Sequence, residues 1–203
     1  MTYIHTEKRA VPGAPLIFTF HGTGGDEHQF SGLAAQLIPE AGVVSPRGDV
    51  SEMGAARFFK RTGEGVYDMD DLAERVAKMG AFVQEMITDG KPSRVIGIGY
   101  SNGANILAAL SFKKPDLFDD LILMHPLIPW APKPQPSLAG KRVLITAGQR
   151  DPIGPAATTQ KLADYYAAQG SATQLVWHEG GHDLRQSEIE AVASFLHPQS
   201  VSA

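Results

Sequence analysis

The sequence contains no cysteine among its 203 residues. This absence excludes disulfide bonds, zinc–thiolate sites and a cysteine nucleophile. No apolar run approaches the roughly 20 residues that a membrane-spanning helix needs. The first nine residues are polar and lack the apolar core of a signal peptide. We therefore expect a cytoplasmic protein with no membrane partner.

Clustered positive charge is also missing. The chain has 18 Lys and Arg residues against 22 Asp and Glu residues, a formal net charge of −4. A protein that binds nucleic acid needs clustered basic side chains to neutralise phosphates, so we expect no nucleic-acid partner. The 43% hydrophobic and 20% charged residues are ordinary for a globular protein. The length favours one domain over residues 1–203.

Short apolar runs alternate with helical patterns along the chain. This alternation predicts an α/β fold with a mostly parallel sheet and helices on both faces. The predicted strands are 16–20, 43–45, 94–99, 121–125, 142–147 and 174–177, and the predicted helices are 27–37, 70–88, 102–112, 156–169 and 184–196. The stretch 126–136 is too rich in proline for a helix or a central strand, and we interpret it as a surface loop.

A candidate nucleophile lies in the pentapeptide Gly99-Tyr100-Ser101-Asn102-Gly103, which fits the pattern Gly-x-Ser-x-Gly. The pattern carries weight only between a buried strand and a helix, and both are predicted here. The sharp turn raises the Ser101 hydroxyl at the carboxyl edge of the sheet, near a helix N-terminus that favours negative charge. The alternative interpretation is a glycine-rich turn with a serine cap.

A serine nucleophile needs a base and a third group that orients the base. Asp151 follows the strand 142–147 and therefore lies at the carboxyl edge of the sheet, where sites in open α/β sheets form. Asp119 and Asp120 precede a strand and belong to the opposite edge. We predict Asp151 as the acid, and its alternative role is that of a turn residue before Pro152.

His182 is the predicted base because it lies in a glycine-rich loop after the last strand, in the chain order Ser, Asp, His. His178 lies at the strand end, too early in the chain to reach Ser101. His125 precedes Asp151, which is the wrong order for a base. The remaining candidates His5, His28 and His197 are expected at the surface, and His21 is expected to have a structural role.

The loop after strand 16–20 contains Gly22, Thr23, Gly24 and Gly25. Acyl transfer places negative charge on a carbonyl oxygen, which needs two backbone N–H donors. We predict these donors at Thr23, in this loop, and at Asn102, directly after the nucleophile. A phosphate-binding loop is the alternative, but neither a Gly-x-Gly-x-x-Gly spacing nor a Gly-Lys-Ser/Thr sequence is found here.

Together, four segments resemble the phospholipase/carboxylesterase family of α/β-hydrolases, which includes the acyl-protein thioesterases. These segments are His21-Gly-Thr-Gly-Gly-Asp-Glu, Gly99-Tyr-Ser-Asn-Gly-Ala, Ala147-Gly-Gln-Arg-Asp-Pro and Gly180-Gly-His. Ser45-Pro-Arg-Gly-Asp and Gly54-Ala-Ala-Arg-Phe-Phe resemble a bacterial subgroup of small carboxylesterases. The loop after His21-Gly differs from that of the acyl-protein thioesterases.

The resemblance implies a compact α/β-hydrolase fold without a lid domain, in which the sheet begins at strand 16–20. It also implies the triad Ser101, His182 and Asp151, oxyanion donors at Thr23 and Asn102, and a possible homodimer. Dienelactone hydrolases look similar but usually use cysteine as nucleophile, and this chain has none.

The expected function is serine hydrolysis of a small carboxylic ester or thioester, with no cofactor and no metal. Arg57, Phe58 and Trp130 are the candidate substrate-binding residues. Arg57 and Phe58 could instead belong to a solvated basic loop with one buried aromatic ring, and Trp130 could simply pack its loop. The alternative functions are a non-catalytic ligand-binding protein of the same fold and an acyl-protein thioesterase or lysophospholipase.

Overall fold

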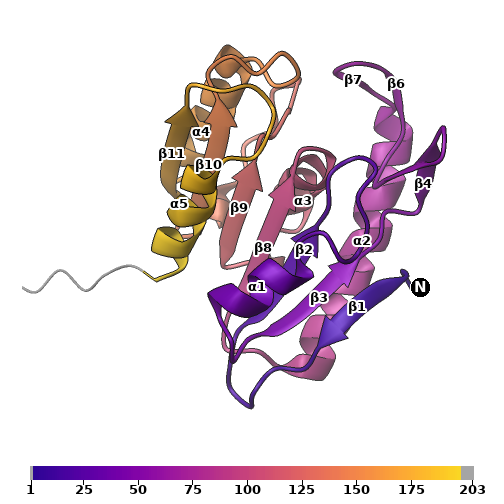
Figure 1. Ribbon diagram of the computed structural model, residues 1–203, viewed down its shortest axis with the longest axis vertical. Helices are drawn as coiled ribbons and strands as arrows, with labels where there is room; N and C mark the ends of the chain where they lie inside the picture. The colour runs from indigo at the N-terminus through magenta and orange to yellow at the C-terminus, as the bar shows by residue number, and fades with distance from the viewer. Residues whose placement is uncertain (1, 198–203) are drawn as a thin grey trace, which may run out of the picture.

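A computed structural model describes residues 2–197 and contains a seven-stranded sheet in the order β1-β3-β2-β8-β9-β10-β11 (Figure 1). Six of these strands run parallel, and β1 pairs antiparallel with β3 at one edge. The strands are β1 (His5–Lys8), β2 (Leu16–Phe20), β3 (Gly42–Pro46), β8 (Val95–Tyr100), β9 (Asp120–Met124), β10 (Arg142–Gly148) and β11 (Ala172–His178).

Helices cover both faces of this sheet. The helices α1 (Ser31–Leu37) and α5 (Gln186–Leu196) lie on the face nearer the viewer in Figure 1. The other face is covered by α2 (Met69–Gly90), α3 (Asn102–Lys113) and α4 (Ala156–Ala168). The predicted mostly parallel sheet between two helical layers is confirmed.

Alternating side chains of the central strands build two apolar cores. In β2, Ile17 belongs to the core on the α1–α5 face, which also contains Phe30 and Val192, whereas Phe18 packs against Phe118 on the opposite face. All five residues of β2 are buried. Burial on both faces explains why the strand is a continuous apolar run rather than an alternating one.

Five strands lie outside the predicted set. β1 is a short, half-exposed edge strand, and the sheet therefore does not begin at residue 16. The other four form two small hairpins, β4 (Val50–Glu52) with β5 (Ala55–Arg57), and β6 (Arg61–Gly63) with β7 (Val66–Tyr67). These segments are too short and too polar to show a strand periodicity.

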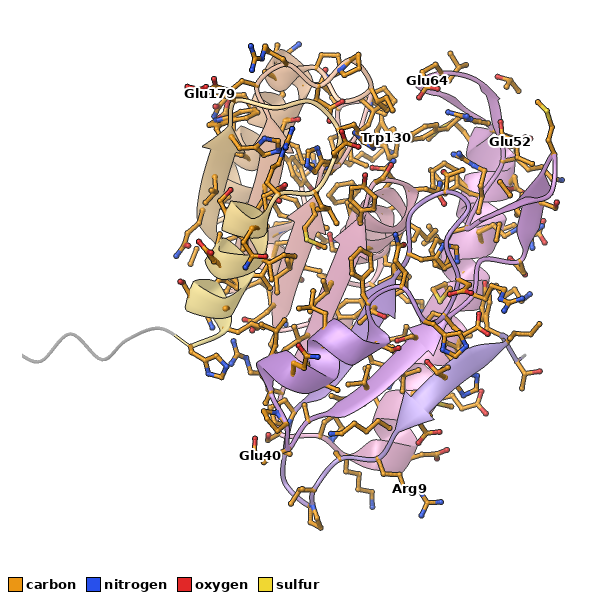
Figure 2. The ribbon with its side chains drawn as sticks, in the orientation of Figure 1. Arg9, Glu40, Glu52, Glu64, Trp130 and Glu179 are labelled. Atoms are coloured by element: carbon orange, nitrogen blue, oxygen red, sulfur yellow. The ribbon has the colours of Figure 1, made fainter. Side chains whose placement is uncertain are left out.

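The carboxyl ends of the parallel strands carry the long loops. Glu52, Glu64 and Trp130 all lie at this end of the molecule, and Arg9 and Glu40 lie at the opposite end (Figure 2). In the described part of the chain, no α-helix is inserted between β9 and β10, where the proline-rich loop runs. Among residues 2–197, no helix has the length and apolar character needed to cross a bilayer.

Candidate active site

Ser101 occupies a strained turn between β8 and α3. Its backbone has φ 52° and ψ −117°, in a region that non-glycine residues rarely adopt. The flanking glycines let the chain pass without a clash, because a Cβ at Gly99 would lie 2.6 Å from the Gly103 oxygen. A Cβ at Gly103 would lie 2.1 Å from the Phe20 oxygen. The turn thus requires glycine on both sides of the serine.

The structure brings the three predicted triad residues together. The Ser101 Oγ lies 2.8 Å from His182 Nε2, and His182 Nδ1 lies 2.7 Å from Asp151 Oδ2. Because an ionised carboxylate only accepts hydrogen bonds, Nδ1 of His182 carries a proton and Nε2 can accept the proton of the serine. This is the tautomer that a general base needs.

Four donors surround the buried carboxylate of Asp151. The amides of Ile153 and Gly154 donate to Oδ1 over 2.8 and 3.0 Å, while Oδ2 accepts from His182 and, over 2.9 Å, from Nδ1 of His125. Burial acts to raise the pKa of Asp151, but these hydrogen bonds outweigh it and hold the pKa below its ordinary value. Asp151 is therefore a fixed anion behind the base.

A second group of polar residues lies behind Asp151. The other ring nitrogen of His125, Nε2, lies 3.1 and 3.3 Å from the two carboxylate oxygens of Glu188. Glu188 also accepts hydrogen bonds from Thr146 Oγ1 over 2.6 Å and from the Arg185 amide over 2.8 Å. Burial acts to raise the pKa of Glu188. The hydrogen bonds from His125, Thr146 and Arg185 lower it by more than burial raises it, so the pKa lies below its ordinary value.

Two sets of side chains have the spacing of metal ligands, namely His125 with Asp151 and His182, and His125 with His178 and Glu188. In the second set, Nδ1 of His178 accepts a hydrogen bond from the Gly180 amide over 2.9 Å. Nε2 of a neutral His178 then carries the proton and has no lone pair for a metal. In the first set, the Nδ1 atoms of both histidines donate to Asp151. Both sets therefore fit a hydrogen-bond network better than a metal site.

The predicted oxyanion donors line the same cavity as Ser101. Within residues 2–197, the backbone amides of Thr23 and Asn102 donate to no protein acceptor, so both remain available to a ligand. Arg57 holds the Thr23 loop, because its Nη1 donates to Thr23 Oγ1 over 2.7 Å. Arg57 is also paired with Glu52 over 3.2 Å.

A cavity of about 320 Å³ opens at Ser101. Leu127 and Ile153 supply its aliphatic wall. The rest of the lining is polar or aromatic, and much of it comes from the unpredicted hairpins and the helix that follows the nucleophile: Arg57, Arg61, Glu64, Tyr67 and Asn105. Arg61 pairs with both Glu52 and Glu64, so the basic groups of this wall are balanced by acidic ones.

Of the three predicted substrate-binding residues, only Arg57 lines this cavity. The ring of Phe58 is 1% exposed and packs between Phe20 and His21, away from the cavity. Its side chain points into the apolar core, where an aromatic ring is buried. Trp130 faces two other surface hollows and packs edge-to-face on Tyr67 at 6.0 Å. Trp130 therefore supports a wall residue rather than forming the wall.

Four further histidines can be placed. His21 is buried, with its ring bonded to the Gly22 oxygen and the Gly48 amide, which agrees with the expected structural role. His28 and His197 lie at the surface as expected. His5 is half-buried on the ring of Phe82, contrary to the expected surface position, because the unpredicted strand β1 carries it onto α2.

Sequence reasoning missed Tyr100 and Glu188, and it missed the contact made by the Asn102 side chain. Tyr100 donates its hydroxyl to the main-chain oxygen of His182, and the side-chain oxygen of Asn102 accepts from the Phe58 amide over 2.8 Å. The position of Tyr100 beside the nucleophile was a usable signal. The contact between Glu188 and His125, which lie 63 residues apart in the sequence, had no signal in the sequence.

Comparison with known proteins places the chain among hydrolases. Residues 52–193 match the dienelactone hydrolase family. MhqD of Bacillus subtilis (strain 168) is 39% identical over 177 residues, which are 86% of this chain and 88% of that protein.

Two solved structures are also similar over nearly the whole chain. The protein Atu2452 from Agrobacterium tumefaciens str. C58 has 52% identity and a TM-score of 0.91, covering 96% of this chain and 95% of that one. A Bacillus cereus carboxylesterase has 35% identity and a TM-score of 0.89, covering 94% of this chain and 92% of that one. These matches confirm the likeness to carboxylesterases drawn from the motifs. The chain is a hydrolase that belongs to the dienelactone hydrolase family.

Proposed function

We propose that this protein is a serine carboxylesterase that cleaves small carboxylic esters or thioesters through an acyl-enzyme on Ser101. The proposal rests above all on the continuous hydrogen-bonded line from Ser101 Oγ to His182 and from His182 to Asp151. The similarity to a carboxylesterase at 35% identity supports the same reaction class.

In the first half of the reaction, His182 takes the proton of Ser101 as the oxygen attacks the substrate carbonyl carbon. The resulting oxyanion accepts hydrogen bonds from the amides of Thr23 and Asn102. His182 then gives its proton to the departing alkoxide or thiolate, and the bond to the leaving group breaks. The acyl group remains on Ser101 as an ester.

In the second half, His182 removes a proton from water, which attacks the acyl-enzyme. A second oxyanion collapses, the acid product leaves, and the proton returns to Ser101. Asp151 stabilises the imidazolium form of His182 in both halves without accepting a proton itself. Every proton in this scheme is exchanged among Ser101, His182, water and substrate.

The cavity argues for a small substrate. Its volume of about 320 Å³ lies at the lower end of the roughly 300–1,000 Å³ range of ligand pockets. A long acyl chain needs a deep apolar groove, whereas Arg57, Arg61 and Glu64 make this wall polar. We therefore expect short acyl groups, including acyl groups with a polar substituent, to be preferred.

A panel of p-nitrophenyl esters and matched thioesters with acyl chains of two to about ten carbons tests the proposal. The wild-type enzyme should turn over the short members fastest, and Ser101→Ala should abolish turnover. Ser51→Ala removes an exposed serine on β4 and serves as the matched control. Turnover that survives Ser101→Ala would refute the acyl-enzyme, and a preference for the longest chains would refute the substrate size.

A further inference from the structure

The ring of His125 lies between two carboxylates. The other polar atom near its ring nitrogens, Nε2 of His178, lies farther away, 3.4 Å from His125 Nε2, and is also 3.3 Å from Glu188 Oε2, to which it can donate its proton. Nδ1 is 2.9 Å from Asp151 Oδ2, and Nε2 is 3.1 Å from the nearer oxygen of Glu188. Both side chains of each pair are buried, with at most 1% exposure. Because ionised carboxylates only accept, each nitrogen must carry a proton, so His125 is an imidazolium cation.

We propose that His125 is a positioning residue that fixes Asp151 and, through its charge, keeps His182 in the neutral form that can act as base. This inference rests on the proposed esterase function, because it assigns His182 the role of base. His125 lines the same cavity as Ser101, but its side chain is fully buried, and in this proposal it contacts neither the substrate nor the reacting atoms. It acts through its hydrogen bond to Asp151 and through electrostatic repulsion between its positive charge and a protonated His182.

The geometry gives both effects a direct route. The rings of His125 and His182 lie edge to face with centroids 5.1 Å apart, and both Nδ1 atoms donate to the same oxygen of Asp151. A fixed cation at this distance opposes the arrival of a second positive charge on His182. Sharing Oδ2 also leaves less of the carboxylate's charge to stabilise a protonated His182.

Glu188 makes the buried cation possible. If His125 paired with Asp151 alone, its positive charge would cancel the negative charge of Asp151. Glu188 adds a second negative charge, so Asp151, His125 and Glu188 together carry a net charge of −1. Burial acts to lower the pKa of His125, and the hydrogen bonds and charges of Glu188 and Asp151 outweigh it, so the pKa is raised. Glu188 on α5 thus stabilises the charged form of His125 from the side away from the substrate.

The ionisable groups that face His125 come from β8, β11, α5 and two loops. They are Tyr100, His178, Glu188, Asp151 and His182. Burial, with the nearby Asp183, Asp151 and Glu188, raises the pKa of Tyr100 to about 12, so Tyr100 is uncharged. Nε2 of His178 carries its proton toward Glu188 Oε2 over 3.3 Å. The positive charge that lies directly against the His182 ring is therefore that of His125, with ring centroids 5.1 Å apart.

The backbone at His125 supports a specialised role. Its φ is 51°, in the left-handed region that costs free energy for a side chain of this size. The strained residue is held by its amide, which donates to the Thr146 oxygen over 2.8 Å. Such strain persists where the surrounding structure demands one particular side-chain direction.

His125→Asn is the matched test variant. Asparagine tolerates positive φ, and its side-chain amide can still donate to Asp151, but it carries no charge. We expect the acidic limb of the kcat/KM profile for p-nitrophenyl acetate to move to higher pH by about one unit, since a charge within about 4–6 Å has effects of this size. At pH 8 the variant should remain within about threefold of the wild type.

The double variant His125→Asn with Glu188→Gln guards against misfolding, because it leaves no unpaired carboxylate. It should displace the acidic limb in the same direction but by less, because losing the negative charge of Glu188 offsets part of the loss of the positive charge of His125. A uniform loss of activity at all pH values, or a limb that moves to lower pH, would overturn the inference, because a purely structural residue changes the height of the profile and not its position.

Titration of ¹⁵N-histidine-labelled protein by NMR tests the inference without any substrate. In the wild type, both ring nitrogens of His125 should be protonated at pH 7. The protonation of His182 should move to higher pH in His125→Asn. A neutral His125, or a His182 titration that the substitution leaves unchanged, would overturn the inference. Failure of the esterase itself would appear separately, as absent wild-type turnover with the NMR result intact.

Discussion

Tyr100 donates its phenolic hydrogen to the main-chain oxygen of His182 over 2.8 Å, so the residue before the nucleophile holds the loop that carries the base. Its ring also packs against the His182 ring, with centroids 5.6 Å apart. Tyr100→Phe keeps the ring and removes the hydrogen bond. Such a bond contributes about 1 kcal/mol, so we expect kcat/KM to fall about fivefold, measured with p-nitrophenyl acetate at pH 8. An unchanged kcat/KM would show that the loop holds its position without this bond.

Arg57 is expected to act on catalysis through Thr23. Arg57→Lys cannot reproduce the simultaneous contacts to Thr23 Oγ1, Glu52 and the Phe59 oxygen. A displaced Thr23 amide weakens oxyanion stabilisation, so kcat should fall about tenfold with little change in KM.

Arg75→Lys is the control for this experiment, because Arg75 also pairs with more than one acceptor, the carboxylates of Asp49 and Asp71, but lies outside the cavity. It should keep wild-type kcat. If Arg57→Lys instead raised KM and left kcat unchanged, Arg57 would bind substrate directly rather than hold the oxyanion loop.

Gly103 should tolerate no side chain. A Cβ there would lie 2.1 Å from the Phe20 oxygen and 2.5 Å from the His21 oxygen, both backbone atoms that cannot rotate away. We expect Gly103→Ala to lower the free energy of unfolding by about 3 kcal/mol or more, measured by urea denaturation. Gly32→Ala on α1 is the control, since a Cβ there meets nothing within 4 Å. A Gly103→Ala protein as stable as Gly32→Ala would contradict the close approach.

Stability should depend on pH through His125 and Glu188. Burial opposes ionisation of Glu188, but its hydrogen bonds lower its pKa on balance, so its contribution is lost as the pH falls below about 4. Burial likewise opposes the charge of His125, but the two carboxylates raise its pKa. Its contribution is complete below about pH 6.5 and is lost as the pH rises through the raised pKa.

The difference in free energy of unfolding between wild type and the variant His125→Asn with Glu188→Gln should therefore be largest between about pH 4.5 and 6.5. Urea denaturation at pH 3.5, 5.5 and 8.5 measures it. A difference that grows from pH 5.5 to 8.5 would have the wrong sign for a histidine whose pKa is raised.

The sequence predicted the central elements because their signals are strong and local. The apolar run of β2 and the stripe of α2 each identify an element without tertiary information. Strand order along the chain was also enough to place Asp151 and His182 at the edge that carries Ser101. Short polar segments such as β1 and β4–β7 pair through backbone hydrogen bonds and tertiary context, which no periodicity reveals.

The walls of the site were harder to predict than its centre. Phe58 follows Arg57 directly, and only the hairpin geometry shows that one side chain faces the cavity while the other joins the core. Chain order argued against His125 as the base, and in the structure its ring nitrogens contact Asp151 and Glu188 rather than Ser101. Its partnership with Glu188 depends on how α5 docks on β10, a tertiary contact that the sequence does not encode locally.

The most direct measurement of the central claim is mass spectrometry of the protein after reaction with a fluorophosphonate. This probe forms a stable adduct only with a serine whose hydroxyl is activated by a base. We predict one adduct per chain on the tryptic peptide 95–113, at Ser101, and no adduct in Ser101→Ala. A label on another residue, or equal labelling of Ser101→Ala, would contradict the account.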